Sequence, residues 1–325
     1  MRDALYPQKQ VPGERNPQLH PFWSWLIAVA GAGTLGTAAF VVLGICLLAW
    51  FATHPPRRRV KGTPAQFGAA FEEVAFASLE GTMLSGWFLP ARNQANGESA
   101  RGVVILCHGM MANRSEAMPW AERLWREGFS VLLFDFRAMG NSDGDLCTAG
   151  YYETQDLRGA VKYLESRPEM AEVPMGVFGF SMGGATAILA AADEERIQAV
   201  ATHGAFATLN GAITQRCRRH FGPLAPIVSW GARHLATRWF PVSPALVSPV
   251  NVVSRLTPRP LLLLHGSRDK VVNLADAHAL HAAAGHPKVL QVLPRSGHRR
   301  IHKSLRDEAR QSVVQFFCEN LVRKN

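Results

Sequence analysis

The sequence predicts an α/β fold, a mostly parallel β-sheet with helices on both faces, preceded by one transmembrane helix. Two patterns indicate the sheet. A β-hairpin pattern over residues 72–90 leads into repeated strand–helix alternation, and Ser181 stands in a Gly-x-Ser-x-Gly turn between a strand pattern and a helix pattern. The preceding helix is indicated by residues 22–52, which contain no charged side chain.

The amino-acid composition indicates the broad class of protein. The chain has 325 residues, of which 47% are hydrophobic, and a formal net charge of +10. A basic balance favours anionic partners, either membrane or nucleic acid, but no zinc-finger spacing or RNA-binding strand motif supports the second. The five cysteines are scattered, with no Cys-x-x-Cys pair, which argues against a disulfide framework or a metal site. We therefore expect no metal, no cofactor and no nucleic-acid partner.

The N-terminal part predicts a membrane anchor. Residues 1–21 are polar and proline-rich and are expected to be a disordered tail. Residues 22–52 exceed the ~20 apolar residues that cross a bilayer, and they are too long for the apolar core of a cleaved signal peptide. The basic linker, residues 53–70, carries Arg57, Arg58, Arg59 and Lys61 directly after the span. The positive-inside rule then favours a catalytic body on the cytoplasmic face.

The body is expected over residues 71–325. Continuous apolar runs indicate buried parallel strands, and segments with helical spacing alternate with them. We predict a hairpin from strands 72–78 and 83–90, further strands at 103–107, 130–134, 175–178, 197–202, 260–265 and 289–293, and helices at 116–127, 154–166, 184–192, 274–284 and 304–321. In such a sheet, functional side chains collect at the carboxyl ends of the strands.

Residues 204–250 interrupt the alternation. They contain aromatic residues, five prolines and no Asp or Glu, and they carry five arginines: Arg216, Arg218, Arg219, Arg233 and Arg238. An insertion at this place predicts a lid of short helical stretches over the site, and its basic, aromatic make-up favours docking on an anionic membrane. The alternative is a loop whose arginines are solvated and whose aromatics pack onto the body.

Ser181 is the predicted nucleophile. A serine on a sharp strand-to-helix turn needs small neighbours, which Gly179 and Gly183 supply, and the turn exposes its hydroxyl. The backbone N–H of Met182 then begins the helix and can face a developing oxyanion. The alternative is a glycine-rich turn with an incidental serine, so the remaining catalytic groups decide between the two interpretations.

The base and the acid are expected on later loops. A serine hydroxyl needs a general base, and that base needs an orienting carboxylate. Asp269 follows the buried strand at 260–265, and His298 follows the strand at 289–293. His302 competes with His298, and Asp269 has the alternative role of a helix cap or loop ion pair. The order Ser181, Asp269, His298 is that of an α/β-hydrolase.

A second oxyanion donor is expected after the strand at 103–107. The loop His108-Gly109-Met110 follows that strand, and Gly109 allows close backbone approach. We predict the N–H of Met110 as the donor, with His108, Gly109, Gly179 and Gly183 in supporting roles.

These motifs carry a family resemblance. The sequence resembles the α/β-hydrolase superfamily in five motifs. They are His108-Gly109, Asp135-Phe136-Arg137 with Gly140 and Ser142, Gly179 to Gly184, His265 to Asp269, and Ser296-Gly297-His298. The chain is similar to bacterial membrane-anchored hydrolases of the Bem46-like and serine aminopeptidase S33 types. Two positions depart from that pattern: Ala138 stands where relatives usually have glycine, and His203 where many have aspartate. The resemblance implies the fold and the triad but no particular substrate.

The predicted function is a membrane-anchored serine hydrolase. It would cleave an ester, thioester or amide of a lipophilic acyl substrate through an acyl-enzyme on Ser181. Two alternatives remain: an acyltransferase that uses the same acyl-enzyme, and a non-catalytic binding protein with the same fold. An intact set of Ser181, Asp269 and His298 argues against the second alternative.

Overall fold

The computed structural model describes residues 42–47, 49–51, 53–92, 100–239, 242–299, 301 and 305–321. It divides into two units, Met1–Cys46 and Leu47–Asn325, and residues 42–46 of the first unit are helical. The expected tail 1–21 and most of the expected span 22–52 lie outside the described residues. Among the helices that are described, none has the length and apolar character needed to cross a membrane.

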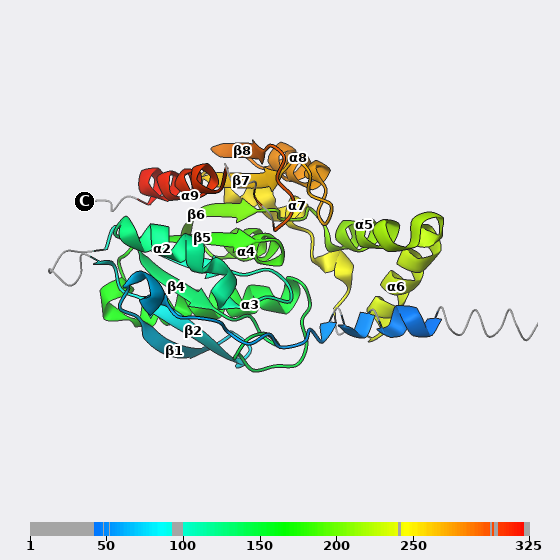
Figure 1. Ribbon diagram of the computed structural model, residues 1–325, viewed down its shortest axis with the longest axis horizontal. Coiled ribbons are helices and arrows are strands. Elements are labelled where there is room, and N and C mark those ends of the chain that lie inside the picture. Colours follow the sequence, from blue (N-terminus) through cyan, green and yellow to red (C-terminus); the bar gives the residue numbers. More distant parts are fainter. Residues whose placement is uncertain are drawn as a thin grey trace, which may run out of the picture. The chain divides into compact units, whose positions relative to one another are not determined.

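An eight-stranded sheet forms the centre of the second unit (Figure 1). Its strand order is β1-β2-β4-β3-β5-β6-β7-β8. The first strands, β1 and β2, pair as an antiparallel hairpin, and β2 pairs antiparallel with β4, whereas all later neighbours are parallel. The strands are β1 (Glu72–Ala77), β2 (Met83–Leu89), β3 (Val103–Cys107), β4 (Ser130–Phe134), β5 (Met175–Phe180), β6 (Ile197–His203), β7 (Leu261–Gly266) and β8 (Lys288–Leu293).

The hydrophobic pattern explains why the central strands are parallel and buried. Every residue of β3, β4 and β5 is buried, which matches the continuous apolar runs of the sequence. The edge strand β8 instead alternates between half-buried and exposed residues along most of its length. The predicted α/β fold with a mostly parallel sheet is confirmed.

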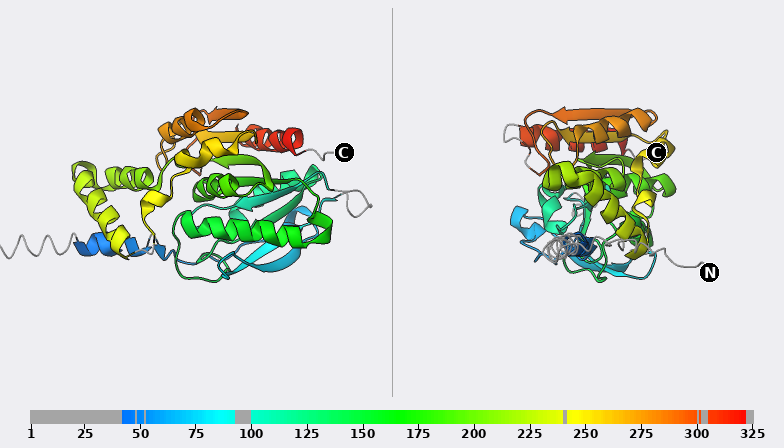
Figure 2. Two further views of the ribbon diagram at one scale, coloured as in Figure 1. Left: turned by 180° about the vertical axis from the view of Figure 1, so that it is seen from behind. Right: turned by 90° about the vertical axis from the view of Figure 1, so that its right-hand side faces the viewer.

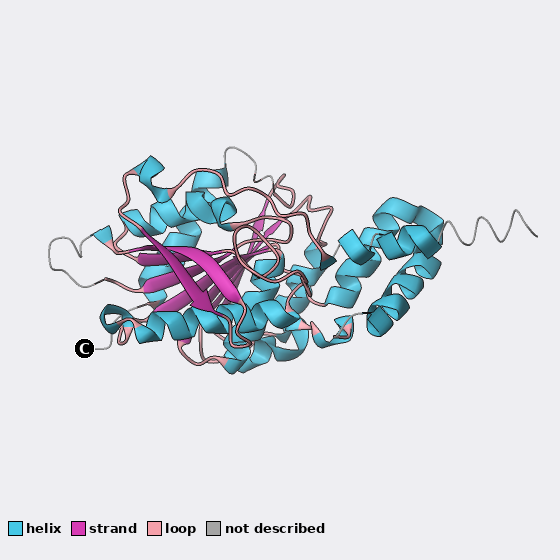
Figure 3. Cartoon of the chain, turned by 90° about the horizontal axis from the view of Figure 1, so that it is seen from below, coloured by secondary structure: helices cyan, strands magenta, loops and turns pink. Residues whose placement is uncertain are grey.

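Helices cover both faces of the sheet (Figures 1–3). On one face α2 (Met118–Arg126) and α9 (Arg306–Asn320) enclose a core cluster with Leu106, Phe178 and Ala201. On the other face α3 (Tyr151–Ser166), α4 (Met182–Asp193) and α8 (Leu274–Ala283) pack around Ile105, Val177 and Val200. Because alternate side chains of a strand point to opposite faces, adjacent residues such as Val177 and Phe178 pack into the hydrophobic cores on opposite sides of the sheet.

Most predicted elements lie within three residues of their observed bounds. The largest shift is in α3, which begins at Tyr151 rather than at residue 154. The buried Glu153 carboxylate accepts hydrogen bonds from the N–H groups of Thr148 and Gly150, and this closes the first turn early. The predicted helix at 116–127 is split into a 3₁₀ turn, η3 (Arg114–Ala117), and α2, whose second residue is Pro119.

Between β6 and β7 the chain leaves the sheet. It forms α5 (Leu209–Phe221), η5 (Gly222–Leu224), α6 (Ala225–Trp239), η6 (Pro244–Leu246), α7 (Pro249–Val252) and η7 (Val253–Leu256). The helices α5 and α6 project from the carboxyl end of the strands (Figure 1). The excursion is closed at its base, because the N–H of Leu209 donates to the carbonyl of Val247 at 2.9 Å and the N–H of Val250 to that of Ala207 at 3.1 Å.

The segment expected as a basic linker, residues 53–70, contacts the body at several points. Arg57 donates to the carbonyls of Ser142 and Gly144, and the carbonyl of Thr53 accepts from the N–H of Cys147. Phe67, in η1 (Pro64–Phe67), lies 6.1 Å from the ring of Trp125. These contacts hold the segment against the sheet domain near both of its ends.

Candidate active site

The turn at Ser181 has the conformation of a strained elbow. β5 ends at Phe180 and α4 begins at Met182, so Ser181 alone connects them, with φ 54° and ψ −116°. A positive φ in a non-glycine residue costs free energy and is retained where neighbouring structure fixes it. Here the N–H of Ser181 donates to the carbonyl of His203 at 2.8 Å, and the carbonyl of Ser181 accepts from the N–H of Ala185 at 3.1 Å.

The two flanking glycines are required by close backbone contacts. A Cβ atom at Gly179 would lie 2.2 Å from the carbonyl oxygen of Gly183. A Cβ atom at Gly183 would lie 2.4 Å from the carbonyl oxygen of Cys107 and 2.6 Å from that of His108. The start of α4 therefore touches both β5 and the end of β3, as the sequence predicted for a turn that needs small neighbours.

The structure brings Ser181, His298 and Asp269 together, although they are far apart in the sequence. Nε2 of His298 lies 2.9 Å from the Ser181 hydroxyl oxygen. Nδ1 of the same ring lies 2.6 Å from Oδ2 of Asp269. Since an ionised carboxylate can only accept, Nδ1–H donates to Asp269 and Nε2 is left to accept from the Ser181 hydroxyl. His302, the competing histidine, lies outside the described residues.

Asp269 is held by its own loop. Its Oδ1 accepts from the N–H groups of Val271 at 2.8 Å and Val272 at 3.0 Å. Burial alone would raise the pKa of this carboxyl, but the hydrogen bond and charge of His298 and the two N–H donors outweigh burial and lower its pKa. Nε2 of His265 lies 3.0 Å from the carbonyl of Val272, so this buried histidine supports the same loop.

The loop after β3, in which Met110 is the predicted donor, begins against the elbow. β3 pairs with β5 so that Cys107 faces Gly179, and the next residues lie against the start of α4. His108 fixes the loop, because its Nδ1 lies 2.8 Å from the Gly109 carbonyl and its Nε2 accepts from the N–H of Phe136 at 3.0 Å. Met182 is the first residue of α4, and a residue at this position has no intrahelical acceptor for its N–H.

Two supporting residues were not predicted from the sequence. Glu116 accepts from the N–H of Gly109 at 2.8 Å, and Arg299 donates to the carbonyl of Met110 at 3.1 Å. Both contacts hold the His108–Met110 loop from outside. The sequence offers a weak signal for Arg299, because it follows His298 directly, but none for Glu116, whose contact depends on how η3 folds back.

The two departures from the family pattern have different surroundings. Ala138 adopts φ 59°, a left-handed conformation that favours glycine. His203 ends β6, is buried, and has its ring centroid 5.2 Å from that of Phe180. Burial first, and then the neighbouring His298 and His265, lower the pKa of His203 to about 3, so its imidazole is neutral.

Comparisons with known proteins agree with the fold. The family model described as serine aminopeptidase S33 matches residues 98–245. The chain is 28% identical over 257 residues to the uncharacterized protein YfhR of Escherichia coli O157:H7, covering 78% of this chain and 83% of that protein. It is 33% identical over 133 residues to thiohydrolase aneE of Aspergillus aculeatus, 40% of each chain. The solved structure of the Pyrococcus furiosus esterase Pf2001 matches with a TM-score of 0.65 and 26% identity, covering 82% of this chain and 99% of that one.

Proposed function

We propose that this chain, which belongs to the α/β-hydrolase superfamily and to its serine aminopeptidase S33-like family, is a serine esterase that acts through an acyl-enzyme on Ser181. The observation that carries the proposal is the pair of contacts made by one imidazole, at 2.9 Å to the Ser181 hydroxyl and at 2.6 Å to Asp269. The similarity to the Pyrococcus furiosus esterase supports the same reaction class.

The reaction follows from these positions. The Ser181 oxygen attacks the acyl carbonyl carbon, and its proton passes to Nε2 of His298. The Asp269 carboxylate stabilises the imidazolium that forms. The N–H groups of Met110 and Met182 donate to the oxyanion, where one donor contributes about 3–4 kcal/mol to lowering the barrier. His298 then protonates the leaving alcohol, and in the second half the same imidazole activates water, which releases the acid and restores Ser181.

A lipophilic acyl group is supported by the excursion beyond β6. Leu224, Ile227 and Trp230 are 60%, 68% and 61% exposed on η5 and α6. Larger exposed apolar patches mark surfaces that contact a ligand, a partner or a membrane. We propose that α5 and α6 form a lid that presents a lipophilic ester to Ser181, with a thioester or an amide as the alternative acyl substrate.

We also propose that the body lies on the cytoplasmic side of a membrane, anchored by residues 22–52. The support is the basic cluster after the anchor. Arg57 is engaged with the body, so the charge toward the membrane interface comes from Arg58, Arg59 and Lys61.

Active-site labelling tests the reaction. A fluorophosphonate probe is expected to modify Ser181 alone, since only this serine has a positioned base, and mass mapping identifies the adduct. Ser181→Ala is expected to abolish labelling and to lower kcat by about 10⁶-fold with little effect on folding. Ser312→Ala is the control, because Ser312 is half-buried on α9 and its hydroxyl contacts only the carbonyl of Glu308 among the described hydrogen bonds. Labelling of another serine, or full activity of Ser181→Ala, would contradict the proposal.

Acyl esters of increasing chain length then define the substrate. We expect kcat/KM to rise with acyl length, because longer chains bury more apolar surface against the lid. Addition of a competing alcohol separates hydrolysis from acyl transfer, since a transferase would form the new ester in preference to the free acid.

A further inference from the structure

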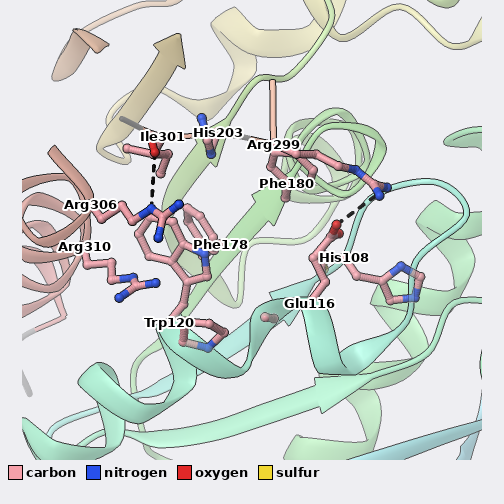
Figure 4. Close-up of a pocket in the computed structure, with 13 residues that line it drawn as sticks. His108, Glu116, Trp120, Phe178, Phe180, His203, Arg299, Ile301, Arg306 and Arg310 are labelled. Carbon is pink, nitrogen blue, oxygen red and sulfur yellow. Dashed lines mark hydrogen bonds and ion pairs between the residues drawn. The ribbon is translucent and has the colours of Figure 1, made fainter. Parts of the chain in front are cut away.

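A cavity lies between the carboxyl ends of β3, β5 and β6, α2 and the start of α9, with Arg299 and Ile301 also in its lining (Figure 4). Its volume is about 210 Å³. A water molecule occupies about 30 Å³ in the liquid, so the cavity has room for roughly seven waters, or for a ligand of about benzoate size. The cavity lining includes neither Ser181 nor His298. It adjoins the active site, because His108, Glu116 and Arg299, which support the His108–Met110 loop, are also part of its lining.

One wall of the cavity is aromatic. The rings of Trp120 and Phe178 lie 4.5 Å apart between their centroids, and Phe180 follows two residues later on the same face of β5. Figure 4 shows these rings grouped around the cavity. Flat apolar surfaces of this kind favour a flat apolar ligand.

The opposite wall carries positive charge that the protein itself leaves largely uncompensated. Arg306 donates to the carbonyl of Ile301 at 3.3 Å, and none of the described carboxylates lies within ion-pair distance of it. Arg310 has Asp307 at 4.0 Å, but Asp307 is already paired closely with Arg123. Burial, together with the nearby charges of Arg123 and Arg306, lowers the pKa of Arg310.

The remaining charged residues of the lining compensate each other. The Glu116 carboxylate accepts from the N–H of Gly109 at 2.8 Å and lies 3.6 Å from Arg299. Among the described lining residues, Arg306, which is exposed, has no carboxylate partner, and Arg310 shares Asp307 with Arg123. The planar guanidinium groups of these two arginines suit a carboxylate.

A buried polar side chain at the inner end of the cavity lacks a partner. His203 is 3% exposed, and its Nε2 makes no hydrogen bond although the atom is buried. Buried polar groups normally have a partner, so an unpaired nitrogen in a cavity wall indicates a place where a ligand or a water completes the hydrogen bond.

We propose that this cavity binds a small organic carboxylate, with its apolar body against Trp120 and Phe178 and its carboxylate on Arg306 and Arg310. The site is distinct from the acyl position over Ser181 and does not depend on the proposed hydrolysis. It is coupled to the triad by contact, because the ring of Phe180 has its centroid 5.0 Å from that of His298. A bound acid would therefore restrict the movement of the imidazole and act as an effector of the enzyme.

Binding of benzoate to the full-length protein, measured by isothermal titration calorimetry, tests the proposal. We expect one saturable site. Benzamide, which has nearly the same shape without the charge, and acetate or inorganic phosphate, which have charge without the apolar body, should each bind at least about ten-fold more weakly. Ser181→Ala should bind benzoate as the wild type does, which separates this site from the proposed active site.

Charge variants locate the site. Arg306→Gln and Arg310→Gln are each expected to weaken benzoate binding by about ten-fold or more, since each removes a charge-assisted hydrogen bond. Arg126→Gln is the matched control: it removes one positive charge from exposed α2 on the same face, but Arg126 does not line the cavity. Absence of saturable binding, equal binding of benzamide or phosphate, or full benzoate affinity in both variants with unchanged thermal unfolding would each overturn the proposal.

Discussion

At the scale of single residues, Asp269 has the most closely defined role. Its two carboxylate oxygens have different hydrogen-bond donors. Oδ1 accepts from the loop N–H groups of Val271 and Val272, and Oδ2 accepts from His298. An amide in place of the carboxylate keeps the first set of bonds and changes the second. The geometry of the loop and the tautomer of the histidine can therefore be separated by one substitution.

Asp269→Asn is expected to reduce kcat by up to about 10⁴-fold while the fold is retained, because the imidazole of His298 would adopt the wrong tautomer. Esterase kinetics over a range of substrate concentrations measure this. Asp193→Asn, at an exposed surface ion pair, is the matched control and should leave kcat unchanged. An Asp269→Asn variant that keeps more than a tenth of the wild-type rate would indicate a different acid.

The lowered pKa of Asp269 also predicts how stability depends on pH. A carboxyl whose folded pKa lies below its ordinary value of 3.8 contributes stability that is present above pH 3.8 and is lost as pH falls through the folded pKa. The stability that this carboxyl contributes should thus shrink as pH falls below about 4, which narrows the difference in Tm between wild type and Asp269→Asn in that range. A difference that stays the same or grows as pH falls below about 4 would contradict the assigned direction.

Ala138 offers a stabilising substitution. Its φ of 59° costs an L-residue about 1–2 kcal/mol, whereas glycine adds about 0.5–1 kcal/mol of backbone entropy to the unfolded chain. Ala138→Gly is therefore expected to raise the free energy of unfolding by up to about 1 kcal/mol. Ala279→Gly, exposed within α8, is the control of opposite sign and should lower it by about 1 kcal/mol. Thermal or urea unfolding measures both variants, and destabilisation by Ala138→Gly would contradict the strain argument.

Some residues of the site could be predicted from the sequence and others could not, and the difference has a physical reason. Ser181, Asp269 and His298 each end a strand pattern or follow one, and parallel strands bring their carboxyl ends to one edge, so local pattern placed them together. Glu116 and Arg299 instead support the site through contacts across the fold, with the N–H of Gly109 and the carbonyl of Met110. Whether the Glu116 carboxylate reaches Gly109 depends on how η3 packs, which no local pattern encodes.

At the scale of elements, strands were more predictable than the helices beyond β6. The strands are continuous apolar runs bounded by polar residues, so their bounds follow from composition. The segment 204–250 suggested short helical stretches because of its prolines, yet α5 and α6 contain 13 and 15 residues. Pro226 is the second residue of α6, a position where a missing N–H costs no hydrogen bond, so it begins the helix instead of breaking it.

The tip formed by the end of α5 and the start of α6 predicts membrane docking. Exposed Arg216, Arg218 and Arg219 precede Leu224, Ile227 and Trp230, so a basic surface adjoins an apolar one. Such surfaces bind anionic lipid interfaces, where each basic residue adds about 1 kcal/mol. We expect the protein without residues 1–56 to bind anionic vesicles in co-sedimentation assays, and added salt to weaken that binding.

Substitution of the three arginines by serine should abolish this vesicle binding. The control changes three exposed arginines elsewhere, Arg101, Arg126 and Arg255, to serine and so alters the net charge equally. If both triple variants lose binding to the same extent, the effect comes from net charge rather than from the tip. Equal binding of the parent protein to neutral and anionic vesicles would remove the electrostatic part of the proposal.

At the scale of the whole molecule, the bond between Arg57 and the body defines where the chain can be cut. Deletion of residues 1–56 retains Arg57 and η1, and it is expected to give a soluble, active hydrolase with its sheet intact. Deletion of residues 1–70 also removes Arg57 and the Phe67 ring that lies beside Trp125, and should lower Tm by several degrees. Solubility, esterase activity and Tm of the two proteins measure this. Aggregation of the shorter deletion would show that the N-terminal segment is part of the fold.

The closed base of the excursion between β6 and β7 bears on how relatives diverge. Both strands pair directly with each other, and the two ends of the excursion are joined by the hydrogen bonds between Leu209 and Val247 and between Val250 and Ala207. Segments of other lengths can be exchanged at this point without shifting the register of the sheet. The loop after Asp269 is a further constraint, because Gln215 accepts from the N–H of Asn273 and Arg219 donates to the carbonyl of Lys270. A transplant of residues 208–248 from one relative to another is thus expected to change the substrate range and to keep the chemistry only where these two contacts are kept.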